Sequence, residues 1–181
     1  NFRDDAIFEC AAYVLSRMLG LDNVPAVVKR TIQGQDGTLQ IWVEHSITEG
    51  TRRKRKIAPL DRQRWDQTWQ VIEIFDNFIY NDDRNSGNII IDQNWGVWMI
   101  DHTRAFRLYT ELRDPSRITQ CERSLWKKLQ TLDEAAVKQQ LSPYLRSLEI
   151  EALLKRRQKL VDYIQKLIQE RGEQAVLFVW G

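Results

Sequence analysis

The sequence predicts an α+β fold with a small first part and a mostly helical remainder. Apolar residues at helical spacing come first, and two strand-like stretches around a glycine-containing turn follow them. After about residue 60, long helical patterns dominate and enclose one short hairpin. The chain has 181 residues, of which 43% are hydrophobic and 29% charged, so it is long enough to bury one core.

The small first part is expected to contain a helix and a hairpin. A helix is predicted over residues 5–19, because apolar residues recur there at helical spacing and Gly20 stands at the end. Residues 26–32 are rich in β-branched side chains and predict a strand. Residues 33–37 contain two glycines and predict a turn, so residues 39–43 are expected to form the returning strand.

A linker between two lobes is predicted over residues 46–60. This stretch contains glycine, proline and the basic run Arg52–Lys56. The expected domains are therefore a partial small lobe over 1–50 and a helical lobe over 51–181. The basic run suits phosphate groups of nucleic acid or of anionic lipid, although most runs of this kind form solvated loops.

The remainder of the chain is expected to be helical around one hairpin. An apolar stripe predicts a helix over residues 61–79, and residues 88–92 and 97–100 predict two short strands around a turn. A capping-box pattern at 131–134 predicts the start of a helix. A longer stripe over 150–168 predicts a long helix that ends at the following glycine.

Composition excludes several classes of protein. A formal net charge of +2 does not suit a molecule built as a whole to bind nucleic acid. The two cysteines, Cys10 and Cys121, form no disulfide framework and no zinc-binding spacing, so we expect a reducing, cytoplasmic location. No apolar stretch is long enough to cross a bilayer, and the first residues lack the apolar core of a signal peptide.

The densest polar stretch, residues 81–88, stands between a predicted helix and the hairpin. Asp83 and Asn88 lie five residues apart in it, and Asp101 follows the returning strand. Phosphoryl transfer needs groups that orient a hydroxyl and hold magnesium, and magnesium prefers carboxylate and amide oxygens. The competing interpretation is an ordinary polar turn. A polar turn at 81–88 does not explain why the ionisable pair Asp101 and His102 directly follows an apolar strand.

These residues, with three further segments, resemble the phosphatidylinositol-kinase-like branch of the protein-kinase fold, including its bacterial relatives of the HipA type. Segment 8–13 is similar to the helix that carries the acidic partner of the ATP-binding lysine, here Glu9. Segment 39–44 resembles the strand leading into the hinge, and segment 100–106 resembles the metal-binding motif with its trailing Phe. The resemblance implies a kinase-like fold with a partial small lobe, a helix plus a β-hairpin, and a mostly helical large lobe.

The resemblance also implies a role for each matched side chain. Asp83 would orient or deprotonate the acceptor hydroxyl, and Arg84 would pair with a carboxylate or a phosphate. Asn88 and Asp101 would bind Mg²⁺ and so contribute to ATP binding, together with Glu44 near the hinge. The implied partners are ATP and an unidentified hydroxyl acceptor, either a protein or a small molecule.

One departure from the family pattern concerns the start of the chain. Such kinases place a phosphate-covering loop and the lysine before the helix of Glu9, and only eight residues precede Glu9 here. We therefore expect the chain to be the C-terminal part of a longer kinase, or ATP binding to be absent or rebuilt. The main hypothesis is a phosphotransferase. The rival is a pseudokinase or interaction module, and a nucleic-acid binder acting through Arg52–Lys56 is the third.

Overall fold

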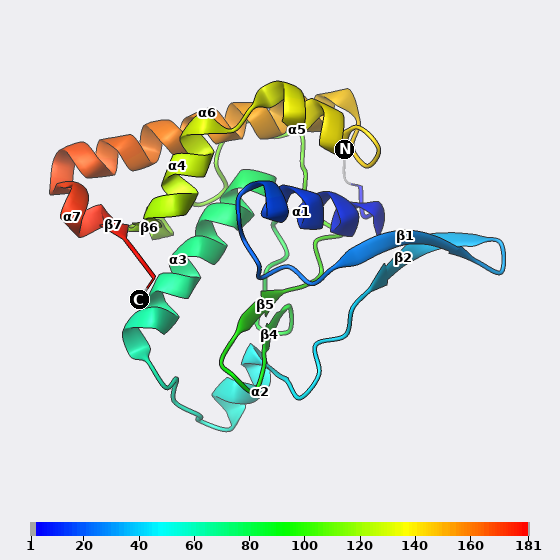
Figure 1. The fold of residues 1–181 in the computed structure, drawn as a ribbon, viewed down its shortest axis with the longest axis horizontal. Coiled ribbons are helices and arrows are strands. Elements are labelled where there is room, and N and C mark those ends of the chain that lie inside the picture. The colour runs from blue at the N-terminus through cyan, green and yellow to red at the C-terminus, as the bar shows by residue number, and fades with distance from the viewer. Residues whose placement is uncertain (1–2, 181) are drawn as a thin grey trace.

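The structure is a computed structural model that describes residues 3–180 (Figure 1). Its first part follows the expected order of elements. Helix α1 (Ile7–Met18) contacts a hairpin of β1 (Val27–Ile32) and β2 (Gln35–Gln40), which projects from the body in Figure 1. Helix α1 buries its apolar face, because its aliphatic and aromatic side chains recur every three to four residues.

The turn between β1 and β2 is shorter than predicted. Gln33 and Gly34 both have positive φ, 53° and 80°, as in a two-residue hairpin turn of the primed kind, which matches the twist of the strands. Strand β2 therefore begins at Gln35 and ends at Gln40. The predicted turn over 33–37 is therefore three residues too long. The strand predicted over 39–43 instead begins at residue 35 and ends at residue 40.

The expected linker 46–60 has regular structure in its first half. Strand β3 (Ile47–Thr48) pairs antiparallel with β4 (Ile89–Ile91), and helix α2 (Glu49–Lys54) follows β3 directly. The Thr48 hydroxyl accepts a hydrogen bond from the Thr51 backbone N–H at 3.0 Å and so caps α2. The segment predicted as a linker between two lobes therefore contains a short strand and a helix up to residue 54.

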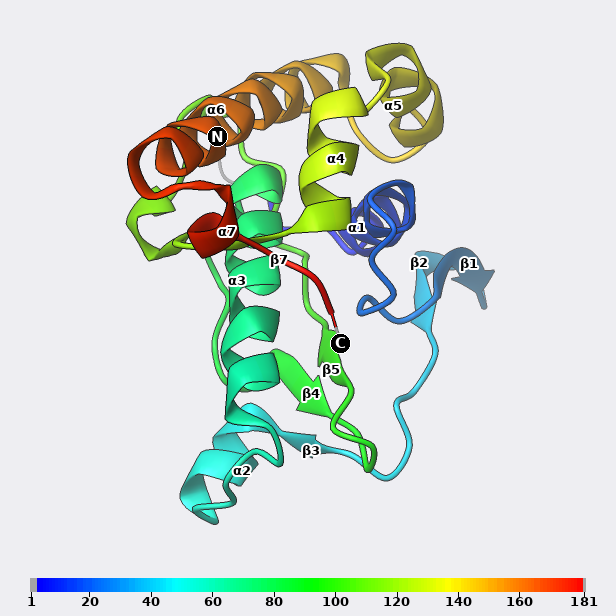
Figure 2. The same cartoon turned by 60° about the vertical axis from the view of Figure 1, so that its left-hand side comes forward.

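Helix α3 (Arg62–Ile79) is the central element and connects the α2 end of the molecule with the C-terminal helices (Figure 2). It begins at Asp61, whose carboxylate accepts from the Arg64 N–H at 2.9 Å. The predicted apolar stripe is confirmed at Trp65 and Phe75, which are 8% and 0% exposed. The helix ends at Tyr80 in a left-handed conformation with φ 51°.

The predicted hairpin after α3 is confirmed. Strands β4 (Ile89–Ile91) and β5 (Val97–Met99) pair antiparallel with Ile90 opposite Trp98. Together with β3 they form a three-stranded sheet in the order β3-β4-β5. Because side chains alternate along a strand, Ile89 and Met99 are both fully buried whereas Ile90 and Trp98 share the less buried face.

The C-terminal part is helical, as predicted, but its first cap differs. The Asp133 carboxylate accepts from the Ala135 N–H at 2.9 Å and begins α5, whereas Thr131 is the last residue of α4. The expected capping box at 131–134 is therefore wrong. The elements after β5 are η1 (Pro115–Arg117), β6 (Cys121–Glu122), α4 (Arg123–Thr131), α5 (Glu134–Leu141), α6 (Ser147–Arg171), α7 (Glu173–Val176) and β7 (Leu177–Phe178), with β6 parallel to β7.

Helices α3 and α6 contact each other in the core, and Arg156 joins them by polar bonds. The buried guanidinium of Arg156 donates to the Phe78 carbonyl at 2.7 Å and to the Arg107 carbonyl at 2.8 Å. Both cysteines are buried and free. Among residues 3–180, no helix combines the length and the apolar character that a membrane span requires.

Candidate active site

The loop over residues 81–88 is held rigid by its own side chains. The Asn81 Oδ1 atom accepts from the Asp83 N–H at 3.2 Å, and the Asn88 Nδ2 atom donates to the Asp83 carbonyl at 3.1 Å. The Gly87 N–H donates to Asn85 Oδ1 at 2.8 Å. Bonds of this local kind are the reason that Asn and Asp dominate such loops, and here they fix the backbone of Asp83.

The β4–β5 hairpin brings Asp101 to this loop. Its strands pair so that the Ile100 N–H donates to the Asn88 carbonyl at 3.1 Å. Asp101 directly follows Ile100, and Asn88 bonds to Asp83 in turn. The three predicted side chains, Asp83, Asn88 and Asp101, are therefore connected through neighbouring backbone at one end of the hairpin.

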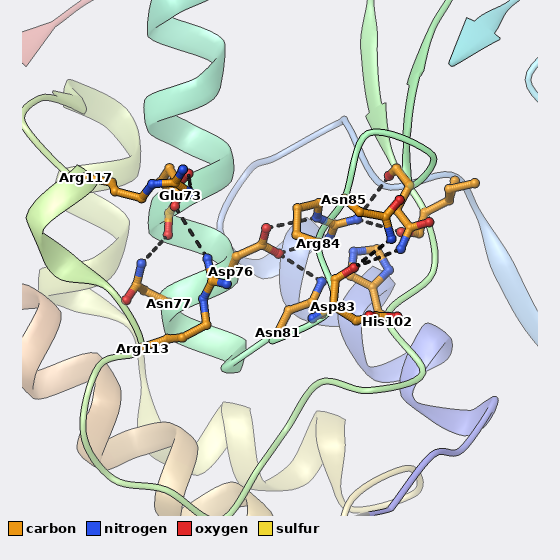
Figure 3. Close-up of polar contacts among 12 residues, drawn as sticks. Glu73, Asp76, Asn77, Asn81, Asp83, Arg84, Asn85, His102, Arg113 and Arg117 are labelled. Carbon is orange, nitrogen blue, oxygen red and sulfur yellow. Dashed lines mark hydrogen bonds and ion pairs between the residues drawn. The ribbon is translucent and has the colours of Figure 1, made fainter. Parts of the chain in front are cut away.

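Arg84 binds the loop to α3 (Figure 3). Its guanidinium contacts the Asp76 carboxylate twice, at 2.9 and 3.0 Å, and both side chains are almost fully buried. It also donates to the Asn88 and Ile100 carbonyls at 3.0 and 2.6 Å. Of the two predicted partners for Arg84, a carboxylate or a phosphate, the structure has the carboxylate, so Arg84 positions the loop instead of facing a ligand.

Asp101 has a backbone conformation that few residues adopt. Its φ is 59°, in the left-handed region where Asp and Asn are the commonest non-glycine residues. One carboxylate oxygen accepts from the Thr103 hydroxyl at 3.2 Å, and the residue is partly exposed. Strained backbone of this kind is concentrated at functional sites.

Glu9 contacts the residue after Asp101. Its carboxylate accepts from the His102 backbone N–H at 2.5 Å and lies 2.9 Å from His102 Nδ1. Burial raises the pKa of Glu9, but the bonds and charge of His102, with a smaller contribution from Arg84, outweigh burial and leave the pKa below its ordinary value. The residue predicted to position a lysine is thus bonded to His102 and supports the backbone beside Asp101.

The Asp83 carboxylate has a cationic neighbour that the sequence did not predict. Arg104 lies 3.5 Å from Asp83 Oδ1 and 3.3 Å from Asp4 Oδ2, and the Asp83 and Arg104 side chains are 38% and 42% exposed. Arg104 follows Asp101 by three residues, so its proximity depends on the course of the chain after β5. The Asp83 side chain is therefore accessible and has a cationic neighbour.

Glu44 lines a pocket whose lining does not include Asp83, Asn88 or Asp101. Glu44 is exposed, and the pocket, of about 650 Å³, lies between residues 41–45, residues 92–94 and Trp98. Trp98 shares a face with Ile90, and its indole N–H donates to Asp92 at 2.8 Å. The pocket thus adjoins the same strands that carry Asn88 and Asp101 at their other ends.

Three side chains of α3 hold the segment after the candidate site. The Asp114 N–H donates to Asn77 Oδ1 at 2.9 Å, Gln70 accepts from the Thr119 N–H at 2.7 Å, and Glu73 pairs with Arg117 at 2.9 Å (Figure 3). Burial raises the pKa of Glu73 despite this ion pair. The chain between Asp101 and α4 is therefore fixed to the same helix that ends at the loop.

Sequence reasoning missed Asp76 and Arg104. Asp76 had a detectable signal, because it follows Ile72 by four residues and precedes Ile79 by three, which places a carboxylate on the buried face of α3. A buried carboxylate needs a partner, and Arg84 is the cation that provides it. Nothing in the sequence places Arg104 beside Asp83, since that contact depends on tertiary folding.

The candidate metal ligands are an amide and a carboxylate. Among residues 3–180, no three His, Cys, Asp or Glu side chains gather at a metal-binding spacing. Asn88 uses its Nδ2 atom to bond Asp83, which leaves its oxygen as the atom suited to a metal. Asp101 adds a partly exposed carboxylate. Two protein oxygens suit Mg²⁺, which keeps several water or phosphate ligands.

Comparison with known proteins decides the fold. No protein-family model matches the chain, and no curated protein matches it by sequence. A structure of Fam20 from hydra, with sugar, matches 97% of this chain and 75% of its own length with TM-score 0.72 and 16% identity. The crystal structure of the golgi casein kinase matches 98% of this chain and 64% of its own with TM-score 0.68 and 16% identity.

The chain has the protein-kinase-like fold. The predicted α+β, kinase-like class is thereby confirmed, while the division into two lobes stays a prediction. The two neighbours are Fam20-type proteins, so the phosphatidylinositol-kinase-like and HipA-like branch suggested by the motifs is not supported. At 16% identity, the likeness establishes the fold and leaves the chemistry to be argued from the site.

Proposed function

We propose that the chain forms the catalytic-loop and metal-binding part of an ATP- and Mg²⁺-dependent phosphotransferase that acts on a hydroxyl group. The observation that carries this proposal is the chain of bonds from Asp83 to Asn88 and from Asn88 to the residue before Asp101. It places a carboxylate, an amide and a second carboxylate at one end of a hairpin in a kinase-like fold.

The chain's own groups have distinct tasks in this proposal. Asp83 accepts a hydrogen bond from the acceptor hydroxyl and takes its proton as the oxygen attacks. Asn88 and Asp101 would hold the magnesium, which would neutralise charge on the phosphates. Arg84 acts through the loop backbone, and Glu9 acts through His102, so both are positioning residues.

The nucleotide base is assigned to the pocket beside Glu44. That pocket is lined by the turn of the β4–β5 hairpin, at residues 92–94, and by Trp98. The polar centre lies at the other end of the two strands, next to Asn88 and Ile100. A planar base fits against the aromatic and aliphatic side chains there, including Trp98, and the phosphates then extend toward Asn88 and Asp101. Glu44 lines this pocket and contributes to binding, not to chemistry.

A second candidate function is a pseudokinase that binds nucleotide or a partner without turnover. Two observations favour it. Arg104 lies 3.5 Å from the Asp83 carboxylate, which competes with an acceptor hydroxyl for that group. Glu9 is bonded to His102, and not to a lysine that would bind phosphates. Only the first candidate requires phosphoryl transfer, and it requires nucleotide at this centre, whereas a pseudokinase that binds a partner requires neither.

Titration calorimetry with ATP, in the presence and absence of Mg²⁺, tests the proposal. We expect binding that depends on Mg²⁺, and we expect Asp101→Asn to weaken the Mg²⁺-dependent part more than Asp83→Asn, because only Asp101 is assigned to the metal. Asp66→Asn on the exposed side of α3 is the control of equal charge. Equal losses for Asp83→Asn and Asp101→Asn would contradict the assignment of roles.

A transfer assay with γ-labelled ATP and hydroxyl-bearing acceptors separates the two candidates. Transfer that Asp83→Ala abolishes supports the enzyme. Mg²⁺-dependent binding without transfer, and unchanged by Asp83→Ala, supports the pseudokinase. Absence of Mg²⁺-dependent binding contradicts the enzyme and a pseudokinase that binds nucleotide, and leaves only a pseudokinase that binds a partner.

A further inference from the structure

Helix α2, its connection to α3 and the start of α3 together concentrate positive charge at one end of the molecule. Residues 49–66 contain seven of the chain's 27 Lys and Arg residues and three of its 25 carboxylates, a net charge of +4 in a chain of net charge +2. The rest of the chain is therefore net negative. In Figures 1 and 2, α2 lies at the opposite end of the molecule from α4, α5 and α6.

Part of this charge is neutralised within the fold, and part is not. The buried Glu49 carboxylate pairs with Arg52 and Arg53 at 2.6 and 2.5 Å, and Arg62 pairs with Asp66 at 2.9 Å. The hydrogen bonds and ion pairs within residues 3–180 include none from the side chains of the next three residues, Lys54, Arg55 and Lys56, which are all exposed. These three side chains are the free cations of this surface.

Lys56 occupies a backbone position that favours glycine. Helix α2 ends with the Ile57 N–H bonded to the Arg52 carbonyl at 3.1 Å and the Lys56 N–H bonded to the Arg53 carbonyl at 3.0 Å. This is the Schellman arrangement, whose left-handed residue is usually glycine, yet Lys56 takes it with φ 55°. Local backbone geometry therefore favours glycine over lysine at this position.

Apolar side chains stand next to these cations. Leu60 is 83% exposed and Ile57 is 36% exposed, on either side of Ala58 and Pro59. Exposed aliphatic side chains flanked by free cations are typical of surfaces that bind anionic bilayers, since the apolar groups enter the interface while the cations meet lipid phosphates. We propose that residues 54–60, the basic loop, attach the protein to a membrane surface rich in anionic lipid.

The surroundings of the basic loop favour lipid over nucleic acid. A single-stranded nucleic acid needs exposed aromatic faces for its bases, but Trp65, next to the loop, is 8% exposed and its ring lies 4.7 Å from the Arg52 guanidinium. Between the cations and Arg62, the aliphatic Leu60 is 83% exposed, and a phosphate backbone would not bind it. This proposal does not depend on the phosphotransferase proposal.

Vesicle co-sedimentation tests the inference. We expect the protein to bind phosphatidylcholine vesicles that contain about 30 mol% phosphatidylserine and not vesicles of phosphatidylcholine alone, with binding that falls as salt rises. Replacing Lys54, Arg55 and Lys56 together by Gln should weaken binding about fivefold per charge. Leu60→Ser should weaken binding without changing net charge.

Matched variants keep the test decisive. Replacing Lys127, Lys128 and Lys138 of α4 and α5 by Gln removes the same charge from the other end of the molecule and should leave binding within about twofold. Lys56→Gly should raise the thermal midpoint while weakening vesicle binding. If the two triple variants lose binding equally, or if Leu60→Ser leaves binding unchanged while duplex DNA binds at the basic loop, the lipid proposal is wrong.

Discussion

The Arg84 guanidinium and the Asp76 carboxylate form a two-bonded ion pair, at 2.9 and 3.0 Å, that joins the end of α3 to the candidate catalytic loop. Neither side chain is more than 6% exposed. Arg84 also donates to the carbonyl of Asn88, one candidate metal ligand, and to that of Ile100, which directly precedes the other, Asp101. One buried pair therefore holds both parts of the site against the core.

Removing one partner of this pair should be costly. Asp76→Ala leaves the Arg84 charge buried without a carboxylate, and we expect the free energy of unfolding in urea to fall by about 3–5 kcal/mol. The exposed pair of Arg62 and Asp66 is the control, because Asp66→Ala should cost less than about 0.5 kcal/mol. A loss for Asp76→Ala as small as that of the control would contradict the structural role.

The sequence predicted the elements whose signals are local. The apolar period of α3 and the two apolar strands around residues 93–96 were sufficient for the helix and the hairpin, and the loop 81–88 followed from its position between them. Asp83, Asn88 and Asp101 could be identified because carboxylate and amide oxygens next to short apolar strands match the ligands that Mg²⁺ prefers. In the structure these residues are connected through hydrogen bonds that involve the backbone of Asp83, Asn88 and Ile100.

Of two further features that sequence reasoning missed, helix α2 has local signals and the contact of Glu9 depends on a distant residue. The basic run was expected within a linker, but its first residues belong to helix α2. Glu49 lies three and four residues before Arg52 and Arg53 and forms an ion pair with each. These pairs and the Thr48 cap stabilise the helix. The bond between Glu9 and His102 joins residues 93 positions apart. The spacing of Glu49 from these arginines and the Thr48 cap are local signals that sequence reasoning did not use, whereas the bond between Glu9 and His102 has no signature in a local pattern.

The backbone at Asp101 allows strain to be separated from metal binding. At φ 59° the Cβ atom of alanine comes too close to the backbone, and glycine has no Cβ atom. Asp101→Gly should therefore be more stable than Asp101→Ala by about 1 kcal/mol. Both variants should lose Mg²⁺-dependent nucleotide binding to the same extent. Urea unfolding and calorimetry on the same samples measure the two effects, and a more stable Ala variant would contradict the left-handed conformation.

Glu73 should make stability decrease with rising pH. Burial raises its pKa above the ordinary value of 4.5, and Asp76 and Asp114 add to the rise against the opposing Arg117 and Arg113. The folded protein then binds this proton more tightly than the unfolded chain, so stability falls as pH rises from about 4.5 through the raised pKa. The stability of the wild type minus that of Glu73→Gln, from urea unfolding at each pH, should therefore decrease over that window.

Glu49 should make stability increase with rising pH, and comparing it with Glu73 tests the direction of both pKa shifts. Burial raises the pKa of Glu49, but the hydrogen bonds and charges of Arg52 and Arg53 outweigh burial and hold it below 4.5. A carboxylate with a lowered pKa stabilises the fold fully above the unfolded value, and this contribution is lost as pH falls through the folded pKa. The advantage of the wild type over Glu49→Gln should thus be largest near neutral pH and shrink below about 4.5. Parallel pH profiles for Glu49→Gln and Glu73→Gln would show that the guanidiniums around Glu49 do not stabilise its ionised form.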